Sequence, residues 1–236
     1  MNSNKINVMR KIIIFAIIAF ASFSCEVDNY GVPDAELYGT ILDAETNEPV
    51  PGDIVNGTVI QLIEHGWVTD QTNVTQTLVV QNDGSYRNSM IFPAKYRITL
   101  VNGNFIPVSP IDTLEIKGRT ELNFKVKPYV RILNAAITKS ANKITATFKI
   151  KQNTTDPVVR IALFCHPNAS VGSSVSIVKT ETNLNSITNP DTSYTLEISL
   201  PNANLIGGRS YHFRIGALSS APGARYNYSE TVSIEM

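Results

Sequence analysis

The sequence has few of the residues that most often carry chemistry. Its 236 residues include only two cysteines, three histidines and one tryptophan, and 20 basic residues balance 20 acidic ones. No His–Cys spacing supports a metal site, and no HExxH, Gly-x-Ser-x-Gly or phosphate-loop motif occurs. Because no basic stripe is present either, nucleic acid is excluded as an expected partner.

Long hydrophobic runs are scarce as well. The one sustained apolar run covers residues 12–23, which is shorter than the roughly 20 residues that a membrane-spanning helix needs. Three basic residues and no acidic residue precede this run, as in the start of an export signal. We therefore expect residues 1–24 to be a signal peptide rather than a membrane span.

The signal is followed directly by Cys25, the predicted lipid attachment point. Small residues stand before it, with Ser22 where the strict lipoprotein motif has Leu. This relaxed form resembles the lipoprotein signals of Bacteroidota. The alternative is an ordinary cleaved signal in which Cys25 is incidental. If Cys25 carries lipid, Cys165 has no partner within the chain and is expected to be a small buried hydrophobic residue.

Residues 25–35 are polar and are expected to form a tether between the lipid and the fold. Glu26 and Asp28 resemble the acidic signal that sends Bacteroidota lipoproteins to the outer face of the outer membrane, although Val27 interrupts it. The predicted location is therefore the outer membrane, with a lipid anchor and exposure at the cell surface.

The pattern after the tether is that of β-strands throughout. Short runs rich in β-branched and aromatic residues are separated by turn residues; they include residues 58–64, 77–81, 96–101, 112–116 and 121–127. No window shows a sustained helical period with caps. An all-β fold of sandwich or barrel type is expected.

A domain boundary is expected at Pro128. Proline lacks the N–H that a central strand needs and suits a junction. The sequence after it starts a second series of strands with its own turn, so we predict two β-sandwich domains, at residues 36–127 and 128–236.

The first domain resembles the transthyretin-like, carboxypeptidase-regulatory-like modules of bacterial surface proteins. Residues 37–52 and 82–100 carry this resemblance. Asp83 and Gly84 form a predicted tight turn because glycine accepts a positive φ, and the sequence from Phe92 to Tyr96 follows the module's Pro-Gly-x-Tyr turn with alanine in place of glycine. The resemblance implies a structural support, without the separate catalytic domain of true carboxypeptidases.

The second domain resembles a fibronectin type III or immunoglobulin-like sandwich. Tyr211 stands where these folds have a corner tyrosine, whose ring is buried and whose hydroxyl bonds to backbone. Here that backbone is expected near Leu205 or Gly207. His212 should face the opposite side of the strand from Tyr211.

The order of these two modules behind a lipoprotein signal resembles a family of two-domain Bacteroidota surface lipoproteins with a domain of unknown function. Residues 28–41 and 128–132 also match the opening and the junction of that family. The resemblance implies that the chain is encoded beside the outer-membrane transporter and the glycan-binding lipoprotein of a polysaccharide-utilisation system, which are then candidate partners.

Three further side chains are candidate functional residues. Trp67 and Tyr226 are candidate ligand contacts, because a flat aromatic ring on a surface can stack on a sugar; the alternative for both is core packing. Thr113 lies in an Asp-Thr-Leu sequence that matches the pattern for protein O-glycosylation in Bacteroidota, and chance is the alternative.

The sequence thus predicts a protein that is not an enzyme and needs no cofactor or metal. The main hypothesis is a non-catalytic accessory lipoprotein of an outer-membrane glycan-uptake system, which binds glycan or supports other components. The alternative is a structural or adhesive surface protein with protein partners.

Overall fold

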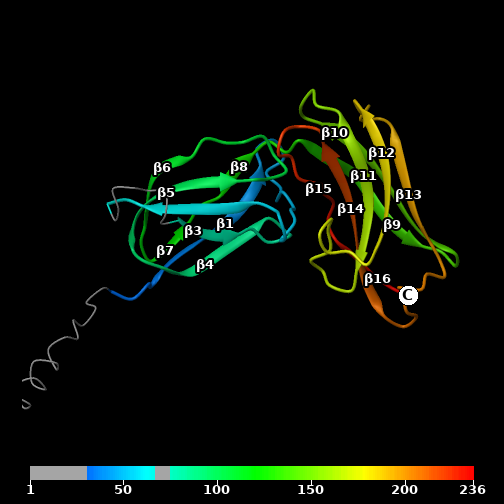
Figure 1. The fold of residues 1–236 in the computed structure, drawn as a ribbon, viewed down its shortest axis with the longest axis horizontal. Helices are drawn as coiled ribbons and strands as arrows, with labels where there is room; N and C mark the ends of the chain where they lie inside the picture. Colours follow the sequence, from blue (N-terminus) through cyan, green and yellow to red (C-terminus); the bar gives the residue numbers. More distant parts are fainter. Residues whose placement is uncertain (1–30, 67–74) are drawn as a thin grey trace, which may run out of the picture. The chain divides into compact units, whose positions relative to one another are not determined.

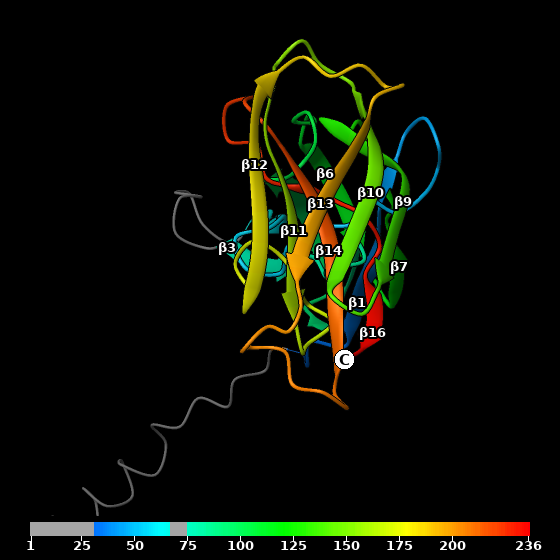
Figure 2. The ribbon, with the colours of Figure 1, turned by 90° about the vertical axis from the view of Figure 1, so that its right-hand side faces the viewer.

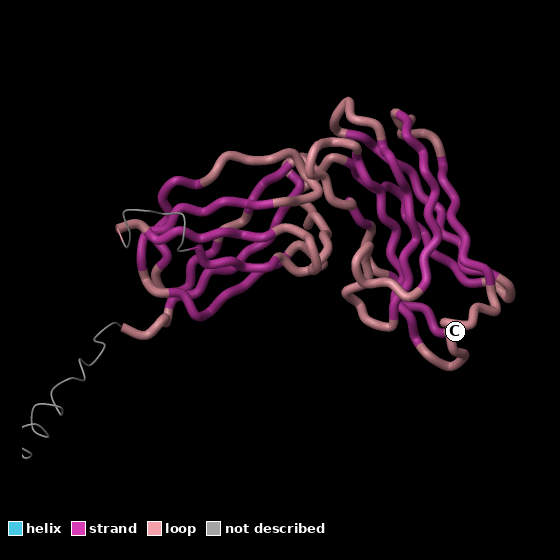
Figure 3. Tube along the Cα trace, in the orientation of Figure 1, coloured by secondary structure: helices cyan, strands magenta, loops and turns pink. Residues whose placement is uncertain are grey.

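The protein is described from a computed structural model, in which residues 31–66 and 75–236 are defined (Figure 1). Pro33–Met236 forms one compact unit. Every regular element in these ranges is a β-strand (Figure 3). The expected all-β class with two β-sandwich domains is confirmed.

The described part contains no helix that is long and apolar enough to cross a membrane.

The strands follow one another in this order: β1 (Ala35–Asp43), β2 (Val59–Glu64), β3 (Thr75–Val79), β4 (Ser85–Ile91), β5 (Ala94–Val101), β6 (Ile111–Ile116), β7 (Arg119–Glu121), β8 (Phe124–Val126), β9 (Val130–Lys139), β10 (Lys143–Gln152), β11 (Val158–His166), β12 (Val178–Ser186), β13 (Ser193–Ser199), β14 (Ser210–Ser219), β15 (Asn227–Tyr228) and β16 (Val232–Glu235).

The first sandwich consists of two four-stranded sheets. One has the order β4-β1-β7, with β8 also paired to β1, and the other has the order β3-β2-β5-β6. Strand β1 pairs antiparallel with β4 and parallel with β7 and β8. Alternation along β1 buries Leu37 and Ile41 in a core shared with Ile60, Leu62 and Ile98 of the other sheet.

The turn predicted at Asp83 and Gly84 precedes β4. Gly84 has a φ of 87°, and the Asp83 carboxylate accepts a hydrogen bond from the Ser85 N–H at 2.9 Å. A Cβ on Gly84 would lie 2.8 Å from the carbonyl oxygen of Val50. Glycine is therefore required here both by the backbone conformation and by the close approach of another chain segment.

The run at residues 121–127, expected as one strand, is divided into β7 and β8 by Leu122 and Asn123. At the break, the side-chain Oδ1 of Asn123 accepts the Thr40 N–H at 2.8 Å, in place of a backbone carbonyl. The prediction of one continuous strand is wrong. The Leu122 N–H still bonds to the Tyr38 carbonyl at 2.9 Å, but at Asn123 a side chain takes the place of the backbone carbonyl that would continue the ladder.

The second sandwich has a three-stranded sheet facing a larger one. Strands β13, β10 and β9 run side by side in that order (Figure 2), and the other sheet has the order β12-β11-β14-β15, with β16 also paired to β14. Every second residue of β10 enters the core, with Ile144, Ala146, Phe148 and Ile150 all buried.

The corner tyrosine expected in this sandwich is present. Tyr211 is buried, and its hydroxyl accepts a hydrogen bond from the Ile206 N–H at 2.9 Å, between the two positions expected from the sequence. His212 is half-buried and follows on the opposite face of β14. This part of the fibronectin-type prediction is confirmed.

Candidate functional site

Two of the predicted site residues, Cys25 and Trp67, lie outside the described residues. The lipid attachment at Cys25 and the ligand contact at Trp67 therefore remain predictions.

Tyr226 lies in an aromatic cluster of the second sandwich. The residue is 9% exposed, and its ring meets Phe164 edge-on with centroids 5.4 Å apart. The hydroxyl donates to Glu181 at 3.4 Å, and burial together with the Glu181 charge raises the pKa of the phenol to about 12. Most of the ring is engaged in packing, and a ligand contact at Tyr226 remains a prediction.

Thr113 lies on β6, at an edge of its sheet, and its side chain is exposed. Its hydroxyl is 3.4 Å from Nε2 of His65, the ring nitrogen that also lies 2.7 Å from the Asp112 carbonyl oxygen. An exposed hydroxyl on an edge strand is accessible for modification, and the O-glycosylation of Thr113 remains a prediction.

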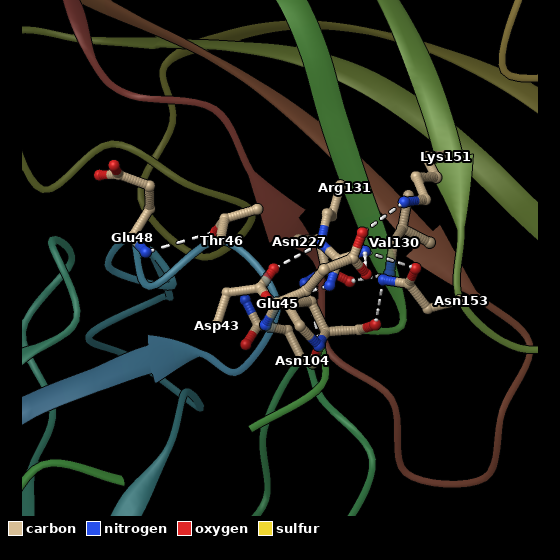
Figure 4. A network of polar contacts seen from close by, with 11 residues as sticks. Asp43, Glu45, Thr46, Glu48, Asn104, Val130, Arg131, Lys151, Asn153 and Asn227 are labelled. Carbon is tan, nitrogen blue, oxygen red and sulfur yellow. Dashed lines mark hydrogen bonds and ion pairs between the residues drawn. The ribbon is translucent and has the colours of Figure 1, made fainter. Parts of the chain in front are cut away.

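The densest polar cluster lies at the junction of the two sandwiches (Figure 4). Arg131 at the start of β9 reaches Asp43 at the end of β1 through two bonds, from Nε to Oδ2 at 2.5 Å and from NH2 to Oδ1 at 2.7 Å. The same guanidinium contacts Glu45 at 2.7 Å, and Lys151 of β10 holds the other oxygen of Glu45 at 2.7 Å. A bidentate pair of this geometry fixes both position and orientation.

Burial and charge act in opposite directions on the Asp43 carboxyl. Burial by itself would raise its pKa, but the hydrogen bonds and charge of Arg131, with the backbone N–H of Glu45, outweigh it and lower the pKa below the ordinary value. The same contacts raise the pKa of Arg131. Both groups are thus held in their charged forms by each other.

Two buried asparagines form a second set of bonds across the junction. Asn104 donates to the carbonyl oxygens of Pro51 at 2.7 Å and Tyr226 at 3.1 Å. Asn227 donates to the Asn104 carbonyl at 2.7 Å and accepts the Val130 N–H at 3.1 Å. Each amide therefore satisfies backbone groups that the junction removes from water.

Arg214 is the centre of a third set of bonds, although its side chain lies on a strand of the second sandwich. It is 1% exposed and donates to four backbone carbonyls, those of Ser229 at 3.0 Å, Gly52 at 2.8 Å, Val171 at 3.3 Å and Asn82 at 2.7 Å. Burial lowers the pKa of Arg214 to about 10, so the group is still charged at neutral pH.

Asp53 completes this third set. Its Oδ2 accepts hydrogen bonds from the Tyr228 hydroxyl at 2.5 Å and the Ser173 hydroxyl at 2.8 Å, and Arg214 lies over the Tyr228 ring at 4.3 Å. Burial, followed by the Asp53 charge, raises the pKa of Tyr228 far above its usual range. Tyr228 therefore acts here as a hydrogen-bond donor that remains protonated.

A cleft of about 250 Å³ lies over the junction, between Pro49, Pro128 and Ile132. Small-molecule sites usually measure about 300–1,000 Å³. Of the charged groups that line it, Asp43 and Arg131 are paired with each other, whereas Glu48 and Glu230 are exposed carboxylates.

Residues 31–66 and 75–236 contain no group of three His, Cys, Asp or Glu side chains arranged to hold a metal ion. Cys165 is fully buried, as the sequence suggested, and burial raises the pKa of its thiol to about 12. A thiol in that state is not a nucleophile at neutral pH.

Family models match both halves of the chain. The N-terminal domain model of the protein of unknown function DUF3823 matches residues 35–127, and the domain of unknown function DUF3823_C matches residues 130–233. The chain belongs to the DUF3823 family. The recognition of a two-domain Bacteroidota family from the sequence is confirmed. No curated protein matches the chain.

Solved structures of DUF3823 relatives share the whole architecture. A protein from Bacteroides uniformis ATCC 8492, described as "a putative carbohydrate binding protein", is 35% identical, with 86% of this chain and 100% of that chain covered and a TM-score of 0.79. A DUF3823 family protein from Parabacteroides merdae ATCC 43184 is 20% identical, covers 87% of this chain and 100% of its own, and has a TM-score of 0.74. A DUF3823 family protein from Bacteroides uniformis ATCC 8492 is 21% identical, with 86% of this chain and 100% of that chain covered and a TM-score of 0.71.

The junction groups of this DUF3823 protein were missed at the sequence level. Asp43, Arg131 and Arg214 each look like ordinary polar residues of a strand, and the bonds that cross between the sandwiches join residues as far as 88 and 162 positions apart along the chain. The one available signal was an arginine at a position of β14 flanked by Phe213 and Ile215, where a polar side chain with no partner is costly.

Proposed function

We propose that this DUF3823 protein is a non-catalytic, carbohydrate-binding lipoprotein that serves an outer-membrane glycan-uptake system and is anchored through Cys25. The observation that carries the proposal is the 35% identity, over 86% of the chain, with a Bacteroides uniformis protein described as a putative carbohydrate binding protein. Both chains share the two-domain architecture over the full length of the relative.

The chemistry of the described residues supports a binding role. The ionisable groups that are most deeply buried, among them Asp43, Arg131 and Arg214, are bonded to one another or to backbone carbonyls. These bonds join the two sandwiches and engage those groups within the fold. A fixed pair of domains is suited to presenting a preformed binding surface.

The proposal predicts that the full chain, purified in detergent, binds at least one polysaccharide of a panel of plant, host and microbial glycans. In a native gel that contains one dissolved polysaccharide, the protein should migrate more slowly than in a gel without that polysaccharide. A panel with no retardation and no binding on a glycan array would contradict carbohydrate binding and favour the structural or adhesive alternative with protein partners.

The anchor gives a second prediction. Acyl chains contribute about 0.8 kcal/mol per buried methylene, and two chains or more hold a protein stably on a membrane. Cys25→Ser should therefore move the protein from the membrane fraction to the soluble fraction of the cell, with the fold unchanged by circular dichroism. Ser24→Ala is the matched control and should stay with the membrane. Retention of the Cys25→Ser protein in the membrane fraction would show that another feature anchors it.

A further inference from the structure

The outer face of the β4-β1-β7 sheet carries an aromatic ring among polar side chains. Tyr38 of β1 lies between Arg87 of β4 and Glu121 of β7 in the strand register. Because Leu37 and Ile41 point into the core, the alternation of β1 places Tyr38 and Thr40 on the opposite face. A half-buried tyrosine is thus presented to solvent by the centre of a sheet.

A hollow opens beside this ring, which we name the β1 hollow. Its lining includes Tyr38, Thr40, Arg87, Glu121 and Asn123, and its volume is about 520 Å³. That volume lies within the range of about 300–1,000 Å³ that is usual for small-molecule sites. The β1 hollow is larger than the cleft at the junction, and the Tyr38 ring in its wall is not buried in the core.

One face of the Tyr38 ring is covered by an arginine. The guanidinium of Arg119 lies 4.8 Å from the ring centroid, and Arg119 itself does not line the hollow. Glu36, whose side chain is only 10% exposed, fixes that arginine at 3.1 Å and Arg87 at 2.6 Å. The ring is therefore preorganised before any ligand arrives, which lowers the entropic cost of binding.

The opposite wall of the β1 hollow results from the break between β7 and β8. There Asn123 bonds to the Thr40 backbone and donates its amide to Oε1 of Glu121 at 2.8 Å. A Cβ on Gly39 would lie 1.9 Å from the Leu122 carbonyl oxygen, so only glycine permits this path of the chain. The arrangement places the Glu121 carboxylate and the Asn123 amide in the lining of the β1 hollow.

These groups have the chemistry of a sugar site. The C–H groups on one side of a pyranose carry partial positive charge and pack on the negative face of an aromatic ring, while its hydroxyls need both donors and acceptors at fixed positions. Tyr38 supplies the ring, Glu121 supplies an acceptor, and Asn123 and Arg87 supply donors.

We propose that the β1 hollow is the carbohydrate-binding site and that it takes an uncharged sugar unit of a polysaccharide. This site assignment rests on the proposed function, and it adds where the sugar binds and which class of sugar is bound. The absence of an excess charge decides the class, since Arg87 and Arg119 are balanced by Glu36 and Glu121. A uronate or sulfate would meet arginines that already pair with Glu36, and it would face the Glu121 carboxylate.

The test compares variants of the full chain in detergent, by affinity gels and titration calorimetry. The probes are neutral polysaccharides (xylan, galactan, mannan and β-glucan) and acidic ones (polygalacturonate and chondroitin sulfate). Tyr38→Ala should weaken binding of the neutral glycan about 10- to 30-fold, the usual scale for losing an aromatic contact. Tyr38→Phe, which keeps the ring, should stay within about threefold.

Two controls separate loss of the site from loss of the fold. Phe92→Ala removes another exposed aromatic side chain of the first sandwich that does not line the β1 hollow, and it should leave affinity unchanged. Glu121→Gln preserves the shape and the acceptor for Asn123, and it should reduce affinity without altering the thermal melt.

The outcomes distinguish this inference from the proposed function. If Tyr38→Ala and Glu121→Gln both bind the glycan as tightly as the unaltered chain does, the β1 hollow is not the site, while carbohydrate binding by the protein still holds. Preference for polygalacturonate or chondroitin sulfate would overturn the uncharged class. Failure of the unaltered chain to bind any glycan would contradict the proposed function itself.

Discussion

Replacement of Arg214 by methionine is expected to destabilise the protein by about 4 kcal/mol or more. The change keeps most of the apolar stem but removes the guanidinium donors from four backbone carbonyls, those of Gly52, Asn82, Val171 and Ser229. Of these, the Asn82 carbonyl still accepts the Gly52 N–H at 3.1 Å. Each buried acceptor that loses its partner costs about 1–3 kcal/mol. Because two of these carbonyls belong to the first sandwich and two to the second, the loss should also weaken their coupling.

The measurement is urea unfolding of the full chain in detergent, followed by circular dichroism. Arg225→Met is the matched control, because the Arg225 side chain is exposed and the same substitution there should change the free energy of unfolding by less than about 0.5 kcal/mol. Arg214→Lys should recover only part of the loss, since one ammonium cannot reach four carbonyls arranged for a planar guanidinium. Equal losses at Arg214 and Arg225 would show that the buried donors contribute nothing specific.

The features that were predictable from the sequence are those encoded by neighbouring residues. Alternation with a period of two identifies the strands, since one face of each is buried. The glycine in Asp83–Gly84 identifies a turn, because few other residues accept its φ of 87°. The corner tyrosine, Tyr211, bonds to Ile206 only five residues away, so a local pattern contains both partners.

The junction was not predictable for the opposite reason. The division of the chain at Pro128 describes where the backbone passes from one sandwich to the next, but it does not show which side chains cross. Asp43 and Arg131 are 88 residues apart, and a single sequence carries no signal that pairs them. The hydrogen bonds of Arg214 go to backbone carbonyls, which every residue type provides, so no composition pattern marks its site.

Tyr38 illustrates a third case. Alternation correctly places it on the face opposite Leu37, but alternation alone cannot tell a ring exposed to solvent from one covered by a neighbouring chain. What distinguishes it is the break between β7 and β8, which depends on a side-chain bond from Asn123 to a strand 83 residues earlier. A hollow formed by a bulge in a neighbouring strand is a tertiary property.

The junction pair gives the second large prediction, at Asp43. Asp43→Asn keeps the size of the side chain and the acceptor for the Glu45 N–H, but it replaces Oδ2 by an amide that cannot accept a bond from Arg131. The guanidinium then keeps the bond from NH2 to Oδ1 but loses the bond from Nε and the carboxylate charge, in a place where the two side chains are 9% and 6% exposed. Breaking one side of a buried pair typically costs about 3–5 kcal/mol, and we expect about 3 kcal/mol because Glu45 still contacts Arg131.

An exposed ion pair of similar length is the control. Lys143 and Glu197 lie 2.6 Å apart but are 46% and 45% exposed, so Glu197→Gln should cost less than about 1 kcal/mol. The double variant Asp43→Asn with Arg131→Met should be more stable than the sum of the single losses predicts, since neither partner is then left buried alone. Additive losses would mean that the two side chains do not stabilise the fold through each other.

The pH dependence provides an independent check on the same pair. The pKa of Asp43 in the folded protein lies below its ordinary value of 3.8, so the carboxylate gives its full stabilisation above that value and loses it as the pH falls through the folded pKa. The unaltered protein should therefore lose stability on acidification below about pH 4 more steeply than Asp43→Asn, and the difference between their free energies of unfolding should shrink. A difference that stays constant from pH 7 to the lowest pH at which both proteins remain folded would show that the Asp43 charge is not what joins the two sandwiches at this point.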